Sequence, residues 1–99
     1  MPTEPAVLAT TDAIPVGGGA IFPAQGVVVT QPTVGTFLGF SSTCTHRGCT
    51  VRAVAGGTIS CFCHGSRFRI TDGSVVGGPA PEPLPRRPVT VTDGSISLG

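Results

Sequence analysis

The chain has 99 residues, among them 15 Gly and 10 Pro, and it carries a formal net charge of +1 at pH 7. This much Gly and Pro argues for many turns and against long helices, and the apolar runs are far shorter than the about 20 residues that span a membrane. No basic run interleaved with aromatic residues is present, which argues against a nucleic-acid-binding protein.

Short β-prone runs separated by turn residues recur along the chain. They predict strands at residues 6–9, 20–22, 26–31, 36–41, 50–54, 58–62, 67–70, 89–92 and 95–98. Turn residues at 17–19, 32, 56–57, 72–73, 77–79 and 93–94 separate these runs. Asp93-Gly94 predicts a two-residue hairpin turn, in which both residues need a positive φ. The pattern predicts a single all-β domain, folded as a small antiparallel β-sandwich.

Two short loops hold all four cysteines and both histidines of the chain. The first reads C-T-H-R-G-C from Cys44 to Cys49, and the second reads C-F-C-H-G-S from Cys61 to Ser66. Thiolates and imidazoles gathered in this way predict a metal site. Spacing alone leaves the ligand set open, because four cysteines allow three disulfide pairings.

The paired loops resemble those of the Rieske [2Fe–2S] proteins, in which two His replace two Cys on one iron. The resemblance implies one cluster per chain, with Cys44 and Cys61 as thiolate ligands and His46 and His64 as imidazole ligands. It also implies that residues 42–84 form a cluster-binding subdomain of two loops, inserted into the sandwich.

The resemblance further implies a disulfide between Cys49 and Cys63 that ties the two loops together, as in the bc-complex type of Rieske protein. A structural disulfide belongs in an oxidising compartment. We therefore expect an extracytoplasmic domain, exported or tethered to a membrane through a signal or anchor that precedes it.

Other residues match positions around the cluster in this family. Ser66 stands where the family has a hydroxyl that donates to a bridging sulfide. Pro79 stands in a stretch that matches the family's proline loop, which covers the cluster. Gly48 and Gly65 are expected to let the loops turn tightly. Phe68 departs from the pattern, since high-potential members carry a Tyr that donates to a cysteine ligand.

The function that the resemblance implies is one-electron transfer, as an electron carrier or as a subunit of an oxidoreductase. Alternatives are a ferredoxin that supplies an oxygenase, and, in a different class, a structural zinc module with Cys and His ligands. A catalytic oxygenase would need a further mononuclear iron site. Both histidines are already used, so we expect no independent catalytic site.

Four arginines, Arg47, Arg52, Arg67 and Arg69, fall between residues 41 and 71 with no Asp or Glu among them. They are either solvated surface charges or a docking surface for an acidic protein. Arg47 replaces the apolar residue that is usual in quinol-oxidising members. We expect a monomer whose partner is an electron-transfer protein, such as a cytochrome or a quinol-oxidising complex.

Overall fold

The computed structural model of the chain describes residues 7–43, 49–61, 65–78 and 82–98. The strands are β1 (Val7–Thr10), β2 (Gly18–Phe22), β3 (Val27–Thr33), β4 (Thr36–Ser41), β5 (Ala53–Ala55), β6 (Thr58–Ser60), β7 (Arg67–Arg69), β8 (Val75–Gly77), β9 (Val89–Thr92) and β10 (Ser95–Leu98). A single 3-10 turn, Thr11–Ala13, is the helical element of these ranges. The described part of the chain contains no helix long and apolar enough to cross a membrane.

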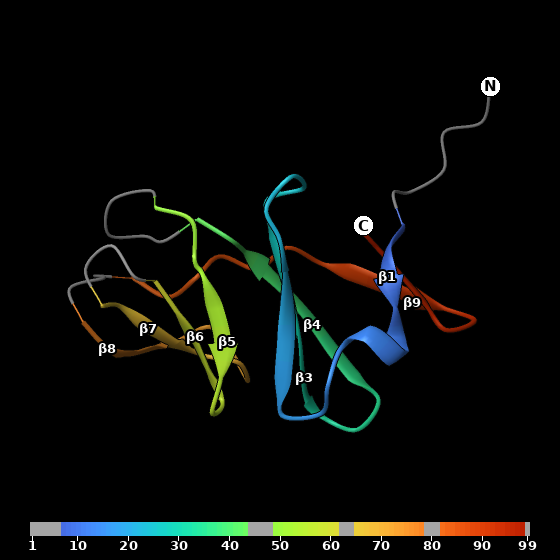
Figure 1. Ribbon diagram of the computed structural model, residues 1–99, viewed down its shortest axis with the longest axis horizontal. Helices are drawn as coiled ribbons and strands as arrows, with labels where there is room; N and C mark the ends of the chain where they lie inside the picture. The colour runs from blue at the N-terminus through green and yellow to red at the C-terminus, as the bar shows by residue number, and fades with distance from the viewer. Residues whose placement is uncertain (1–6, 44–48, 62–64, 79–81, 99) are drawn as a thin grey trace.

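The strands form three antiparallel sheets, which confirms the predicted all-β fold. Their orders are β1-β10-β9, β2-β3-β4 and β5-β6-β7-β8. Figure 1 shows the four-stranded sheet at one end of the long axis, β3 and β4 in the middle, and β1 and β9 at the opposite end.

Strand β3 lies between two hydrophobic cores. It contributes side chains to both, because successive side chains of a strand point to opposite faces. Val27 and Val29 pack with Ile96 of β10 in the core between the two three-stranded sheets. Val28 points the other way and packs with Phe40 of β4 in the core that the four-stranded sheet shares. Burial on both faces accounts for the continuous run of apolar residues in this strand.

The four-stranded sheet is anchored to the middle sheet through this second core. Ile59 of β6 pairs with Phe68 of β7, and both side chains are fully buried against Val28 and Phe40. A hydrogen bond across the junction adds to the packing, as the Thr30 hydroxyl donates to the Ile70 carbonyl at 2.9 Å. The end of β7 is thereby fixed to the sandwich.

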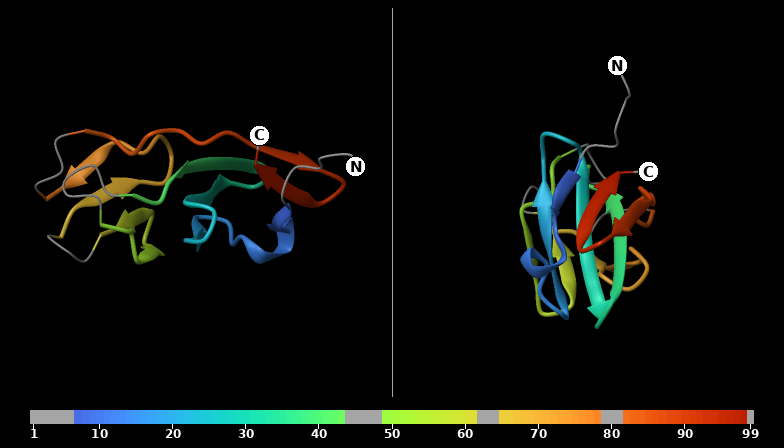
Figure 2. Two further views of the ribbon diagram at one scale, coloured as in Figure 1. Left: turned by 90° about the horizontal axis from the view of Figure 1, so that it is seen from above. Right: turned by 90° about the vertical axis from the view of Figure 1, so that its right-hand side faces the viewer.

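The segment of residues 82–88, here called the proline segment, runs along β4 from the four-stranded sheet towards β9 (Figure 2). The Ser41 N–H donates to the Pro85 carbonyl at 2.8 Å, and the Arg87 N–H donates to the Gly39 carbonyl at 2.9 Å. A Cβ on Gly39 would collide with the Arg87 carbonyl oxygen. Glycine is therefore what lets this segment lie close against β4.

Several local predictions are confirmed. The strands expected at 36–41, 89–92 and 95–98 have those bounds. Asp93 and Gly94 have φ values of +50° and +78°, as the predicted two-residue turn requires.

Other expectations need correction. Pro32 does not end a strand, because β3 continues to Thr33. The proline is tolerated there because the pairing of β3 with β4 is irregular between Thr30 and Thr33. Gly18 and Gly19 belong to β2 rather than to a turn, and a Cβ on Gly19 would lie 2.5 Å from the Val29 carbonyl oxygen. Strand β8 was not expected, because its last residue, Gly77, falls in the turn predicted at residues 77–79; among the described residues β8 pairs with β7.

Candidate metal centre

The second cysteine loop is closed at its base by two backbone hydrogen bonds. The Cys61 N–H donates to the Ser66 carbonyl at 2.8 Å, and the Gly65 N–H donates to the Cys61 carbonyl at 3.1 Å. Gly65 has a φ of +77°, a conformation that costs glycine little. Cys61 is 1% exposed and belongs to the core with Phe68.

The first cysteine loop is closed in a similar way at the end of β4. Thr43 and Thr50 form an antiparallel bridge, and the Val51 N–H donates to the Ser42 carbonyl at 2.7 Å. Cys49 packs against the same core as Cys61. The two loops therefore start from neighbouring points on one core.

Gly78, which follows β8, lies against the end of the second loop. A Cβ on Gly78 would lie 2.5 Å from the Ser66 Cα and 2.8 Å from the Gly65 carbonyl oxygen. Ser66 is fully buried at this contact. Pro79, which was expected to cover the cluster, lies outside the described residues.

The structure describes only part of the predicted site. Of the four predicted ligands, Cys61 is described, whereas Cys44, His46 and His64 lie outside the described residues, as do Cys63 and Gly48. Within the described ranges no three His, Cys, Asp or Glu residues gather as a metal site. What is described fits a thiolate-bound cluster, because a buried cysteine lies at the base of a closed loop with a buried hydroxyl five residues later.

Comparison with known proteins decides the family. A family model of the Rieske [2Fe-2S] domain matches residues 7–88, which include both cysteine loops. The chain belongs to the Rieske family. Its cofactor is therefore a [2Fe–2S] cluster, as the sequence predicts.

Individual Rieske proteins resemble the chain in sequence and in fold. The cytochrome b6-f complex iron-sulfur subunit of Chlorobaculum tepidum is 35% identical over 85 residues, covering 84% of this chain and 46% of that protein. The plasma membrane Rieske protein PetC3 of Synechocystis PCC 6803 superposes with a TM-score of 0.74 at 30% identity, covering 95% of this chain and 98% of that one.

A ferredoxin of Sphingomonas yanoikuyae B1 shares the fold, with a TM-score of 0.72 over 96% of this chain and 97% of that one. Its sequence is 22% identical to this chain. The chain spans less than half the length of the curated relatives that it matches.

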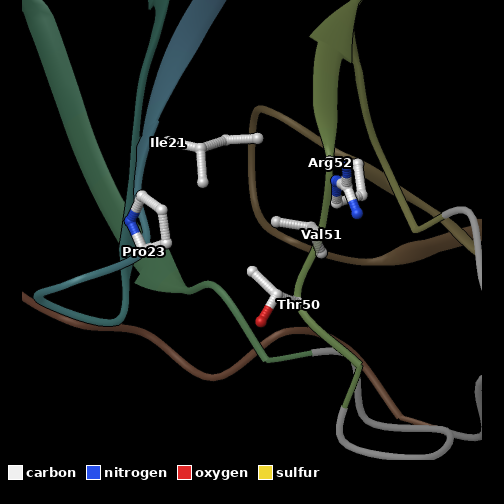
Figure 3. A pocket seen from close by; sticks show the side chains of 5 residues that line it. All are labelled: Ile21, Pro23, Thr50, Val51 and Arg52. Carbon is white, nitrogen blue, oxygen red and sulfur yellow. The ribbon is translucent and has the colours of Figure 1, made fainter.

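A hollow of about 400 Å³ lies beside the first loop, and sequence reasoning did not identify it. Ile21 and Pro23 form one side, and residues 50–52 form the other, where Thr50 and Val51 point towards Pro23 (Figure 3). The two sides are too far apart in the sequence for any local signal to predict the hollow. It marks the junction between the β2-β3-β4 sheet and the segment that carries Cys49.

Charge on this end of the molecule is mostly positive. Arg52, Arg67 and Arg69 are all exposed. Asp72 follows β7. Its pKa is lowered because the side chain and backbone of Ser74 hydrogen-bond its carboxylate, with smaller help from the charges of Arg69 and Arg86. Asp72 thus stays ionised at neutral pH.

Proposed function

We propose that this domain transfers single electrons through a [2Fe–2S] cluster held by Cys44, His46, Cys61 and His64. The observation that carries the proposal is the Rieske match over residues 7–88, which spans both cysteine loops. The burial of Cys61 at the base of a closed loop supports it. In this proposal residues 42–84 are the cluster-binding subdomain.

The test is a redox titration followed by electron paramagnetic resonance over a range of pH. Imidazole ligands bind a proton more tightly when the cluster is reduced, so the midpoint potential should fall as pH rises. Where one proton accompanies one electron, the slope is about −59 mV per pH unit. A colourless protein that binds zinc instead would contradict the proposal, and a potential near −400 mV without pH dependence would indicate a cluster held by four thiolates.

Two buried residues near the loops are proposed to set the potential. Ser66 is fully buried next to the second loop, and a hydroxyl donating to a sulfide favours the reduced cluster. A hydrogen bond worth about 1 kcal/mol corresponds to roughly 40 mV for one electron. Ser66→Ala should therefore lower the midpoint potential by about that amount, measured by voltammetry.

Phe68 supplies the complementary substitution. Its ring is fully buried in the same core as Cys61, so Phe68→Tyr places a hydroxyl in the core next to the predicted ligand. We expect this variant to raise the potential by a similar amount. An unchanged potential in both variants would show that neither position faces a cluster sulfur.

We further propose that Cys49 pairs with Cys63, which would join the two loops. The packing of Cys49 against the core that also holds Cys61 supports this pairing, because it brings the bases of the two loops together. A disulfide of this kind favours an exported or membrane-tethered, respiratory-type protein over an oxygenase ferredoxin. Mass analysis of the intact, non-reduced protein should find the bond, whereas two free thiols at these positions would favour the ferredoxin.

The partner is proposed to be another electron-transfer protein, such as a cytochrome or a quinol-oxidising complex. The similarity to a cytochrome b6-f complex iron-sulfur subunit, and to a putative respiratory nitrate reductase subunit Rieske of Haloferax mediterranei, supports a place in a respiratory-type complex. In such a complex the chain would act as an electron-carrying subunit of an oxidoreductase.

A further inference from the structure

Two arginines lie next to each other on the solvent-exposed face of β7, because the residue between them in the sequence points to the opposite face. Arg67 and Arg69 are exposed, whereas Phe68 between them is fully buried. Residues two apart in a strand point to the same side and start about 7 Å apart. The strand therefore presents two like charges side by side to solvent, here called the β7 arginine face.

The two arginines of the proline segment, Arg86 and Arg87, contact other residues of the chain. The Arg86 guanidinium lies 5.4 Å from the centre of the Phe40 ring. Arg87 Nη1 donates to the carbonyls of Gln25 and Gly26 at 3.4 and 3.5 Å. These two side chains stabilise the fold through contacts within the chain.

The β7 arginine face has no acidic counterpart on its own sheet. Strands β5 to β8 contain no Asp or Glu, and the residues paired with Arg67 and Arg69 on β6 are Ser60 and Thr58. Asp72 accepts a hydrogen bond from the Ser74 N–H at 2.9 Å, and Arg69 donates to the Ser74 hydroxyl at 3.3 Å. Among the described residues, no carboxylate forms an ion pair with either arginine.

Arg67 lies close to the candidate metal centre. It pairs with Gly77 of β8, and a Cβ on Gly77 would lie 3.7 Å from Arg67 Nη2, so the guanidinium extends over β8 where the glycine leaves room. The next residue, Gly78, packs against Ser66 at the base of the second loop. This positive charge thus lies beside the point where the loop and β8 meet.

Arg69 borders a hollow of about 510 Å³ that lies between the four-stranded sheet and the middle sheet, on whose side Gly17 and Pro32 line it. Thr58 and Gly57 also line it, together with Val76, which is 41% exposed. A hollow with a cation and an apolar wall suits a carboxylate that lies next to an apolar side chain. Both the positive charge and the hollow on this face therefore favour a partner surface that carries carboxylates.

We propose that the β7 arginine face docks the acidic surface of a redox partner protein, against the side of the four-stranded sheet. This inference rests on the proposed electron-transfer function and names the surface by which the partner is held. Redox encounters need only small interfaces, below about 1,200 Å², and opposite charge raises their association rate. Arg67 and Arg69 are exposed and form no ion pair with a carboxylate of the described residues, although Asp72 lies near enough to Arg69 to feel its charge, so they supply that charge beside the cluster loop.

The test compares two double variants of the cluster-loaded protein that lose the same two charges. Arg67→Gln/Arg69→Gln removes the β7 arginine face, and Arg86→Gln/Arg87→Gln is the matched control. The probe is a small c-type cytochrome with an acidic surface, studied by stopped-flow electron transfer at about 0.01 M and about 0.5 M salt, because screening is weak at the first and strong at the second.

At low salt we expect the β7 variant to lose at least about fivefold in association rate and the control less than about twofold, with both differences vanishing at high salt. Equal losses in the two variants would mean that only net charge matters, and rates indifferent to salt would mean that neither pair steers the partner. Either result overturns the proposal, as does faster transfer to a basic cytochrome.

A second readout separates this inference from the proposed function. The same acidic cytochrome with zinc in place of its iron takes up no electron, so its affinity reports docking alone. Weaker binding by the β7 variant, with the electron paramagnetic resonance signal of the cluster unchanged, supports the docking surface. Unchanged binding with an intact cluster overturns the docking surface and leaves the electron-transfer function standing.

Discussion

His64→Ala should abolish the Rieske-type electron paramagnetic resonance signal of the protein. In the proposed ligand set, removing one imidazole would leave one iron with a single protein ligand, and a methyl group offers no nitrogen in its place. The second loop that carries residue 64 is closed by the hydrogen bonds between Cys61 and residues 65–66. Those bonds involve only the backbone, so the loop should still form in the variant.

The experiment needs a control that separates loss of the ligand from loss of the fold. Circular dichroism should show an unchanged β-sheet signal in His64→Ala. His64→Cys restores a ligand but adds negative charge to the cluster, so it should recover a cluster with a lower potential, in the direction of the thiolate-only type. Full retention of the original signal in His64→Ala would show that the ligand assignment is wrong.

Features that depend on neighbouring residues could be predicted from the sequence. The Asp93-Gly94 turn follows from the φ preferences of two adjacent residues, and the turn at Gly65 follows from its place in the second loop. The family resemblance also rests on two short loops. None of these predictions needs knowledge of which distant segments meet.

Features that depend on distant segments could not be predicted in this way. Strand β8 is short and exists because β7 is beside it, and Pro32 is tolerated because the pairing of β3 with β4 is irregular there. The sequence left it open whether the arginines between residues 41 and 71 are solvated surface charges or a docking surface. The structure places Arg67 over Gly77 and Arg69 beside Ser74, and only spatial neighbours give that information.

The contact between Gly78 and the second loop allows a second prediction with a large effect. Gly78 has a φ of +89°, and a Cβ there would meet the backbone of Ser66 at 2.5 Å from its Cα and 2.8 Å from its nitrogen. Real Cβ atoms do not approach a backbone so closely, so either β8 or the loop must move. Gly78→Ala therefore strains the backbone and also forces apart two segments at the candidate metal centre.

Gly35→Ala is the matched control, because Gly35 has a φ of +82° and a Cβ there would meet nothing within 4 Å. This control should cost only the backbone strain, about 1–2 kcal/mol in the free energy of unfolding. Gly78→Ala adds an overpacking cost of about 1–3 kcal/mol, and should therefore lose about 2–5 kcal/mol in total.

Urea unfolding of both variants measures this difference, and iron content measures its consequence for function. A domain with total stability of about 5–15 kcal/mol can survive the control substitution easily, but Gly78→Ala should release part of its iron because the second loop is displaced. If the two variants lose the same stability and both keep their iron, then Gly78 is needed only for its backbone conformation. A larger loss confined to Gly78→Ala would instead show that close packing of β8 against Ser66 holds the second loop in place.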